Sequence, residues 1–328
     1  MSVLTSLTAL PIQVATPDIS RWQRGSGSAH AIAYVHERTA ALPGPDVLIT
    51  ALVHGNEYSG AIVVAELLAT GWQPARGRVT FAFCNVAAFA KFDAAKPDAA
   101  RFVDEDFNRV WSAARLDGNE QSAELARARE LRPFVDRATH LLDLHSMHEL
   151  GAPLLVTGTL QRNIDFAQAL QTQSQAIIDT GHADGVRMRD YSEFSNPEGQ
   201  RIALLLEAGQ HWQASSVAVA RNTLARFLVA AGSLSQLEAE ASLPKGWLQP
   251  DVAPAPPVRV LQAVVAQSMD FVFTEAFTGG EVIPQAGTVI AHDAGRPVAT
   301  PHDNCVLVMP SVRQLRPGVT VVRLGRLI

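Results

Sequence analysis

The sequence has 328 residues, of which 47% are hydrophobic, and its 27 basic and 32 acidic side chains give a formal net charge of -5. This length allows one large domain plus a small one, and the scattered basic residues argue against nucleic acid as a partner. The first 20 residues lack the basic start and long apolar core of a signal peptide, and no apolar run approaches the roughly 18 to 20 residues of a membrane span, so we expect a cytoplasmic protein without a membrane partner.

Five short apolar runs, each closed by a turn or a polar residue, are predicted to be strands. They cover residues 46–55, 78–85, 139–146, 153–158 and 201–209. Near-continuous apolar runs of this length fit strands that are buried on both faces. Helical patterns accompany them at 59–70, 119–138, 162–179 and 216–232. The alternation of buried strands and helices predicts an α/β sandwich with a largely parallel sheet.

The composition changes near residue 245. The stretch 243–260 contains five prolines, and short alternating strands with Gly/Pro turns follow it. We therefore predict a catalytic domain over 1–245, a Pro-rich linker over 246–257 and a small all-β domain over 258–328. The hairpins of this last domain resemble those of biotinyl/lipoyl-type barrels, but no lysine follows Lys245 to carry a swinging-arm cofactor. We expect the domain to cover the rim of the site or to form a homo-oligomer interface.

Histidine and glutamate side chains stand at the ends of three predicted strands. His54 and Glu57 end the first run, His145 ends the third and Glu207 ends the fifth. Ligands of an open α/β sheet bind at the carboxyl ends of its strands, and two imidazoles with one carboxylate make an open zinc site. We expect zinc on the first three residues, with Glu207 as general base and later acid. Asp143 shares the strand face of His145, either as a partner of that imidazole or as an ordinary acid at a buried edge.

The stretch RFVDEDFNRVW, residues 101 to 111, forms a second polar cluster. Asn108 and Arg109 would make a carboxylate clamp, because guanidinium binds a carboxylate through two parallel hydrogen bonds. Arg101 would then polarise a scissile carbonyl and stabilise the negative charge that develops on it. The spacing fits equally well an acidic loop that enters a helix, with Arg109 paired to a neighbouring aspartate.

Four motifs, HGNE, RFVDEDFNR, LLDLHS and LLLEAG, occur in this order. Together they resemble the succinylglutamate desuccinylase/aspartoacylase family of zinc hydrolases, which are relatives of the zinc carboxypeptidases. The resemblance spans residues 45 to 215 and implies a carboxypeptidase-like α/β/α sandwich with a mixed, largely parallel sheet plus a small C-terminal β domain. It also implies one zinc ion per chain, bound by His54, Glu57 and His145, with Glu207 as the catalytic base. It further implies that Asn108 and Arg109 bind a substrate carboxylate and that Arg101 binds the scissile carbonyl.

The resemblance implies hydrolysis of the amide bond of a small N-acyl amino acid, which gives a carboxylate and a free amino acid. Two alternatives remain open: a zinc carboxypeptidase that acts on short peptides, and a non-catalytic, metal-dependent binding protein for acyl amino acids. The acyl group and the amino acid are also open. The stretch 187–201 either binds a second carboxylate of the substrate or is an ordinary solvated loop. The candidate residues for such binding are Arg187, Arg189, Tyr191 and Arg201.

Overall fold

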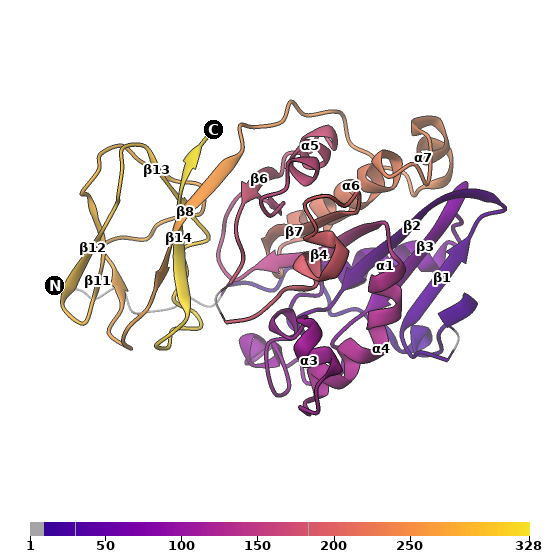
Figure 1. Ribbon diagram of the computed structural model, residues 1–328, viewed down its shortest axis with the longest axis horizontal. Coiled ribbons are helices and arrows are strands. Elements are labelled where there is room, and N and C mark those ends of the chain that lie inside the picture. Colours follow the sequence, from indigo (N-terminus) through magenta and orange to yellow (C-terminus); the bar gives the residue numbers. More distant parts are fainter. Residues whose placement is uncertain (1–9, 30, 183) are drawn as a thin grey trace.

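A computed structural model of the chain describes residues 10–29, 31–182 and 184–328 (Figure 1). Within these ranges an 11-stranded mixed sheet has the order β1-β3-β2-β4-β7-β5-β6-β8-β14-β13-β10. Its strands are β1 (Val35–Thr39), β2 (Leu42–Ala51), β3 (Arg76–Phe83), β4 (His140–Met147), β5 (Leu154–Val156), β6 (Gln175–Ile178), β7 (Ile202–Gln210), β8 (Val258–Val265), β10 (Val282–Ile283), β13 (Cys305–Val308) and β14 (Thr320–Leu327). A separate three-stranded sheet contains β9 (Val272–Phe273), β11 (Val289–Asp293) and β12 (Arg296–Ala299).

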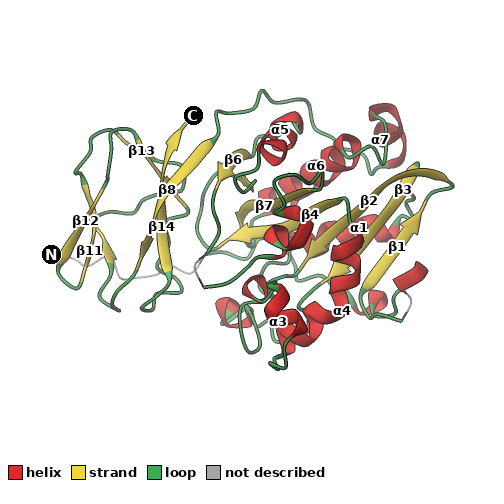
Figure 2. Cartoon of the chain, in the orientation of Figure 1, coloured by secondary structure: helices red, strands yellow, loops and turns green. Residues whose placement is uncertain are grey.

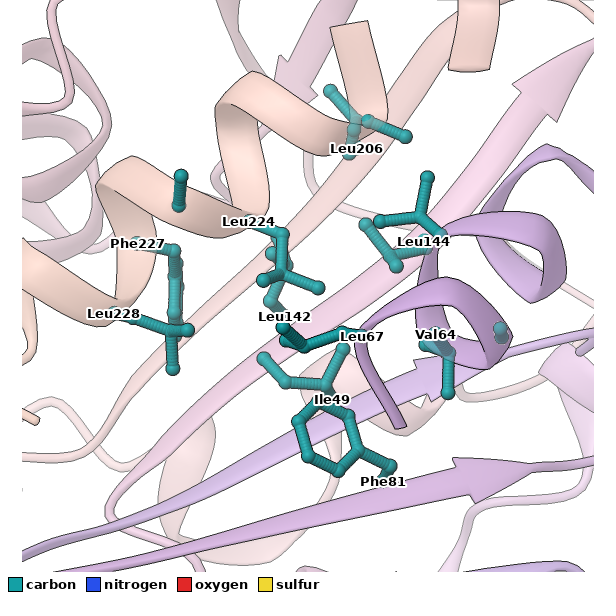
Figure 3. Packing of buried hydrophobic residues seen from close by; sticks show 14 of the residues in the cluster. Ile49, Val64, Leu67, Phe81, Leu142, Leu144, Leu206, Leu224, Phe227 and Leu228 are labelled. Carbon is teal, nitrogen blue, oxygen red and sulfur yellow. The ribbon is translucent and has the colours of Figure 1, made fainter. Parts of the chain in front are cut away.

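Helices cover both faces of the central strands. They are α1 (Ser59–Ala69), α2 (Val86–Phe89), α3 (Ala113–Asp117), α4 (Ala123–Arg137), α5 (Gln161–Ala169), α6 (Ala214–Ala230) and α7 (Gln236–Ser242). Side chains of α1 and α6 pack on one face of the sheet, and those of α4 pack on the other. Figure 3 shows Leu67 of α1 and Leu224 of α6 meeting Ile49 and Leu142 of the sheet. Helices on both faces explain why the central strands read as nearly continuous apolar runs.

The strands that carry the predicted site run parallel to one another. β2 pairs with β3 and β4, and β4 pairs with β7, all in parallel register. In the β4–β7 pair, the Cα of His145 lies opposite that of Glu207. The carboxyl ends of β2, β4 and β7 therefore meet at one edge of the sheet, as the sequence predicts for an α/β fold.

The predicted fold class is confirmed, but one predicted helix is wrong in its second half. The pattern over 162–179 predicts a single helix, whereas α5 ends at Ala169 and residues 175–178 form the strand β6. Gln171 adopts a left-handed backbone with φ of 49°, which ends the helical path, and the apolar residues after it are buried between β5 and β8. A short apolar run fits a helix or a strand equally well until its tertiary neighbours are known.

The C-terminal strands extend the main sheet instead of standing apart from it. β6 pairs with β8 in parallel, and β14, β13 and β10 follow in order. Residues 258–328 contain strands and loops only, which form the lobe without helices in Figure 2. The division into 1–245, 246–257 and 258–328 stays a prediction.

Among the described residues, no helix combines the length and the apolar character that crossing a membrane requires.

Candidate metal centre and substrate cavity

The loop between β2 and α1 carries the first two predicted ligands, His54 and Glu57. Leu52 turns the chain out of β2 through a left-handed backbone with φ of 57°. Gly55 then passes so close to neighbouring backbone that an added Cβ would lie 2.4 Å from Ala100 O, and its N–H donates to Arg101 O at 3.0 Å. The HGNE motif therefore needs glycine at this position, because only a residue without a Cβ lets the two backbone segments approach so closely. The contact holds the loop that carries His54 and Glu57 against the segment at Ala100 and Arg101.

Three side chains converge as the sequence predicts. Glu57 Oε1 lies 2.7 Å from His54 Nδ1, and Glu57 Oε2 lies 3.0 Å from His145 Nδ1. One ligand atom from each residue falls within 4.8 Å of the others, and all three side chains are buried. The backbone N–H of Ser146 also donates to Glu57 Oε2 at 3.1 Å, which fixes the carboxylate between the two imidazoles.

Each imidazole is held from behind by an aspartate. His54 Nε2 lies 3.0 Å from Asp106 Oδ1, and His145 Nε2 lies 2.9 Å from Asp143 Oδ2. Burial raises the pKa of Asp106, but the charges of His54 and Arg101 outweigh burial and hold that pKa well below its usual range. An ionised aspartate at Nε2 keeps a proton on that nitrogen and directs the lone pair of Nδ1 toward a metal ion. The donor set and its supporting carboxylates thus fit a bound divalent cation.

Glu207 lies beside this group on β7 and lines the cavity described below. Its carboxyl is buried, and its Oε2 has no hydrogen-bond partner among the described residues. Burial, reinforced by the charge of Glu57 and opposed by His145 and Arg101, raises the pKa of Glu207 to about 8. A carboxyl group with this environment can take up and release a proton near neutral pH.

The cluster at 101–111 reaches the same centre. Arg101 donates from Nη1 to Glu57 Oε1 at 3.1 Å and from Nη2 to Asp106 Oδ2 at 3.2 Å. Asn108 is buried and its Oδ1 accepts the backbone N–H of Met188. Arg109 donates from Nε to Asp184 at 3.0 Å, and its Nη2 lies 3.9 Å from Asp106 Oδ2. The arginine is thus paired with acids, as the alternative interpretation holds, yet it also faces the cavity.

A cavity of about 330 Å³ opens over these groups. The proposed metal ligands, base, clamp and carbonyl-binding arginine all line it except Glu57, whose carboxylate lies between the two imidazoles. Its opposite wall comes from the C-terminal strands, with Val308, Met309 and Thr320 among its residues. The C-terminal lobe therefore covers one side of the site, which was one of the two roles expected of it.

Of the four loop candidates, only Arg187 lines this cavity. Arg189 bonds backbone carbonyls, Tyr191 accepts from Arg132, and Arg201 donates to Asp136 O. The sequence interpretation missed Arg323 of β14, which also lines the cavity with Asp179 and His182. An arginine inside the apolar run TVVRL was its only signal, because the pairing that brings β14 here is not visible in the sequence.

Comparisons with known proteins agree with this architecture. A model of the succinylglutamate desuccinylase/aspartoacylase catalytic domain matches residues 43–231. A curated protein named "Probable aspartoacylase" from Parasynechococcus marenigrum (strain WH8102) is 34% identical over 134 residues, which are 39% of this chain and 42% of that protein. The chain thus matches less than half the length of this relative.

Solved structures show the same fold over most of the chain. A succinylglutamate desuccinylase from Vibrio parahaemolyticus has a TM-score of 0.61 at 19% identity, covering 90% of this chain and 86% of its own. A succinylglutamate desuccinylase/aspartoacylase from Rhodobacter sphaeroides has a TM-score of 0.63 at 18% identity, covering 90% and 88%. The product-bound ectoine utilization protein EutE (DoeB) from Ruegeria pomeroyi has 0.62 at 18%, covering 89% and 87%.

Proposed function

Because this chain belongs to the succinylglutamate desuccinylase/aspartoacylase family, we propose that it is a zinc-dependent hydrolase of the linear amide bond in a small N-acyl amino acid. The observation that carries this proposal is the buried group of His54, Glu57 and His145, with Glu207 beside it at the edge of a closed-over cavity. Zinc in hydrolases takes this donor set, and when bound it supplies a Lewis acid and lowers the pKa of water. The two Nδ1 atoms and the Glu57 carboxylate would hold one ion per chain.

Glu207 moves the proton in the proposed reaction. Its carboxylate takes a proton from the water that attacks the carbonyl carbon, the C–N bond breaks, and Glu207 returns the proton to the leaving nitrogen. Arg101 uses two of its five N–H groups on Glu57 and Asp106, so donors remain for the carbonyl oxygen as negative charge develops there. The products are a free amine and a carboxylate.

Arg109 and Asn108 are proposed to hold the amino-acid carboxylate. The acid nearest to Arg109 is Asp184, at 3.0 Å from its Nε, and the side chain of Asp184 is 63% exposed. An exposed ion pair of this kind contributes little, so a substrate carboxylate can replace Asp184 at small cost. Asn108, the other half of the clamp, is buried, and its Oδ1 accepts the backbone N–H of Met188, which fixes its side chain.

Two further guanidiniums point to an amino acid with a second acidic group. Arg187 and Arg323 both line the cavity and share one carboxylate, Asp179, at 3.2 Å and 3.3 Å. Arg187 Nη2 is buried and lacks a hydrogen-bond partner within the described ranges, whereas Arg323 Nε faces the shared Asp179. A buried donor without a partner, beside a second guanidinium that shares Asp179, favours an acceptor on the ligand, so we include acidic amino acids in the proposed substrate class.

A substrate panel tests the proposal. N-acetyl and N-succinyl derivatives of acidic and neutral amino acids are assayed beside short peptides, with zinc-loaded wild type and Glu207→Gln. We expect turnover of the N-acyl amino acids, and a loss in kcat of roughly 10²- to 10⁴-fold in the variant at unchanged zinc content. Turnover of peptides alone would favour a carboxypeptidase. Ligand binding without turnover in both proteins would favour a binding protein.

A further inference from the structure

Three polar side chains outside the metal centre form a hydrogen-bonded chain with no part in the proposed reaction. Ser146 Oγ lies 2.8 Å from His211 Nδ1, and His211 Nε2 lies 3.1 Å from His148 Nδ1. Ser146 is 3% exposed and His211 is 0% exposed, whereas His148 lines the substrate cavity. The chain therefore runs from the buried end of β4 to the cavity wall.

The second ring nitrogen of His148, Nε2, has no bonding partner among the described residues. No hydrogen bond or ion pair reaches its Nε2 from residues 10–29, 31–182 or 184–328. The nearest carboxylate, Asp98, lies 3.5 Å from Nδ1, the nitrogen that already faces His211. A polar ring atom in a cavity wall without a protein partner is a group that a ligand can satisfy.

The chain of hydrogen bonds decides what Nε2 can offer. Burial lowers the pKa of both imidazoles, and a neutral imidazole has one donor and one acceptor nitrogen. If the Ser146 hydroxyl donates to His211, then His211 donates to His148 Nδ1, and Nε2 carries a proton toward the cavity. If every bond reverses, Nε2 presents a lone pair. His148 can therefore meet either a donor or an acceptor.

His148 lies away from the carboxylate clamp. Its Nδ1 lies 3.5 Å from Asp98 Oδ1, and Asp98 lines a neighbouring pocket together with Arg101. Arg109 instead pairs with Asp184, whose Oδ1 also lies 3.9 Å from His182 Nδ1. With the amino-acid carboxylate on Arg109 and the scissile carbonyl at Arg101, the acyl part of the substrate is the part that faces His148.

We propose that His148 hydrogen-bonds the acyl group and that the site therefore prefers acyl groups with a polar atom beyond the amide carbonyl. Ser146 and His211 are positioning residues, because they act on the substrate only through the ring of His148. The inference rests on the proposed function, since that function supplies the orientation of the substrate. It adds a residue that selects the acyl group.

The test uses two acyl groups of equal length. N-succinyl and N-butanoyl derivatives of one amino acid differ only in a terminal carboxylate or methyl group, and the ratio of their kcat/KM values measures the preference. In zinc-loaded full-length protein, His148→Phe should lower this ratio by about 10- to 100-fold, mainly through KM, because a hydrogen bond to a charged group is lost. His148→Gln should recover part of the ratio, and Ser146→Ala should lower it less than His148→Phe does.

His292→Phe is the control, because His292 is an exposed residue of β11 that does not line the cavity. It should keep the wild-type ratio. Calorimetric titration with succinate and butanoate, the two carboxylate products, repeats the comparison without turnover. Equal ratios in wild type and His148→Phe by both measurements would overturn the inference. Absence of hydrolysis with the His148-dependent binding difference intact would count against the proposed function alone.

Discussion

At the proposed metal centre, two aspartates hold the imidazoles of His54 and His145. Asp106 and Asp143 each contact the Nε2 atom of one histidine, and neither belongs to the three residues that could bind the metal directly. A carboxylate at this position fixes the ring orientation and raises the basicity of the coordinating nitrogen. We therefore expect both to govern metal affinity.

Asp106→Asn and Asp143→Asn should each weaken zinc binding by about 10- to 100-fold, as measured by competition with a chromophoric chelator. Asp104→Asn is the matched control from the same loop, because Asp104 accepts the backbone N–H of Ala123 and contacts no imidazole. A zinc affinity of Asp106→Asn equal to that of Asp104→Asn would show that the contact at Nε2 has no effect on the metal.

Some residues around the proposed metal centre can be predicted from the sequence, and others cannot. His54 and Glu57 are three residues apart in one motif, and His145 ends a clear apolar run, so pattern alone brought them together. Asp106 stands among other acids, and only the folded loop shows which acid reaches His54. His211 lies 65 residues after Ser146 without a motif, so no sequence signal links the two.

At the scale of elements, helix α4 holds the loop that carries Arg101 and Arg109. Glu124, fully buried in its first turn, accepts the backbone N–H groups of Val103 at 2.7 Å, Asp104 at 3.1 Å and Glu105 at 3.3 Å. It also accepts Nδ2–H of Asn85 at 2.8 Å. Four donors on one carboxylate fix the loop to the helix.

Glu124→Gln should destabilise the fold by about 1–3 kcal/mol and raise KM, because the new amide N–H₂ group faces donors. Denaturant unfolding and steady-state kinetics measure the two effects. Glu130→Gln is the control on the same helix, since Glu130 is 54% exposed and pairs only at the surface with Arg127, so it should change stability by less than about 1 kcal/mol. A Glu124→Gln protein with wild-type stability and KM would show that the loop needs no such anchor.

The start of β4 carries a histidine that makes the fold sensitive to acid. His140 packs against Phe166 and Phe227 with ring centroids 5.6 Å and 6.4 Å away, and burial lowers its pKa from 6.5 to about 4. The unfolded chain takes up this proton below pH 6.5 and the folded chain only near pH 4, so the free energy of unfolding falls as pH drops through that interval.

His140→Phe should remove about 2 kcal/mol of the loss in stability between pH 6.5 and pH 4, less than the full shift implies because the ring is partly exposed. Urea unfolding of wild type and variant at several pH values gives the difference directly, since the remaining histidines are common to both. Parallel stability curves for the two proteins across that interval would contradict the assignment.

The element types followed from the sequence where the pattern was long. The buried runs at β2, β4 and β7 and the helices α1 and α6 were all predicted, because strands covered on both faces are almost wholly apolar. The pattern predicts the end of a helix where the strand β6 lies, since a four-residue strand with three apolar side chains carries no period of its own. Its identity depends on pairing with β5 and β8, which only the fold provides.

At the scale of the whole molecule, the sheet places the substrate cavity. The parallel strands bring the proposed metal ligands and Glu207 to one edge, and the continuation of the same sheet through β8 and β14 brings Arg323 to the same cavity. The sequence predicted a β-rich C-terminal part, but not that its strands would join the main sheet. Strand pairing between residues 81 positions apart leaves no local pattern, as the partners Ile177 and Val258 show.

The central claim is that catalysis depends on one metal ion held by His54, Glu57 and His145. Titrating the metal-stripped chain with zinc, while following both bound metal and hydrolysis of an N-acyl amino acid, tests it most directly. Activity should rise with bound zinc, level off at one equivalent per chain, and be absent in His145→Ala, which should bind no stoichiometric zinc. Full activity in the stripped protein, or recovery by His145→Ala at one equivalent, would contradict the account.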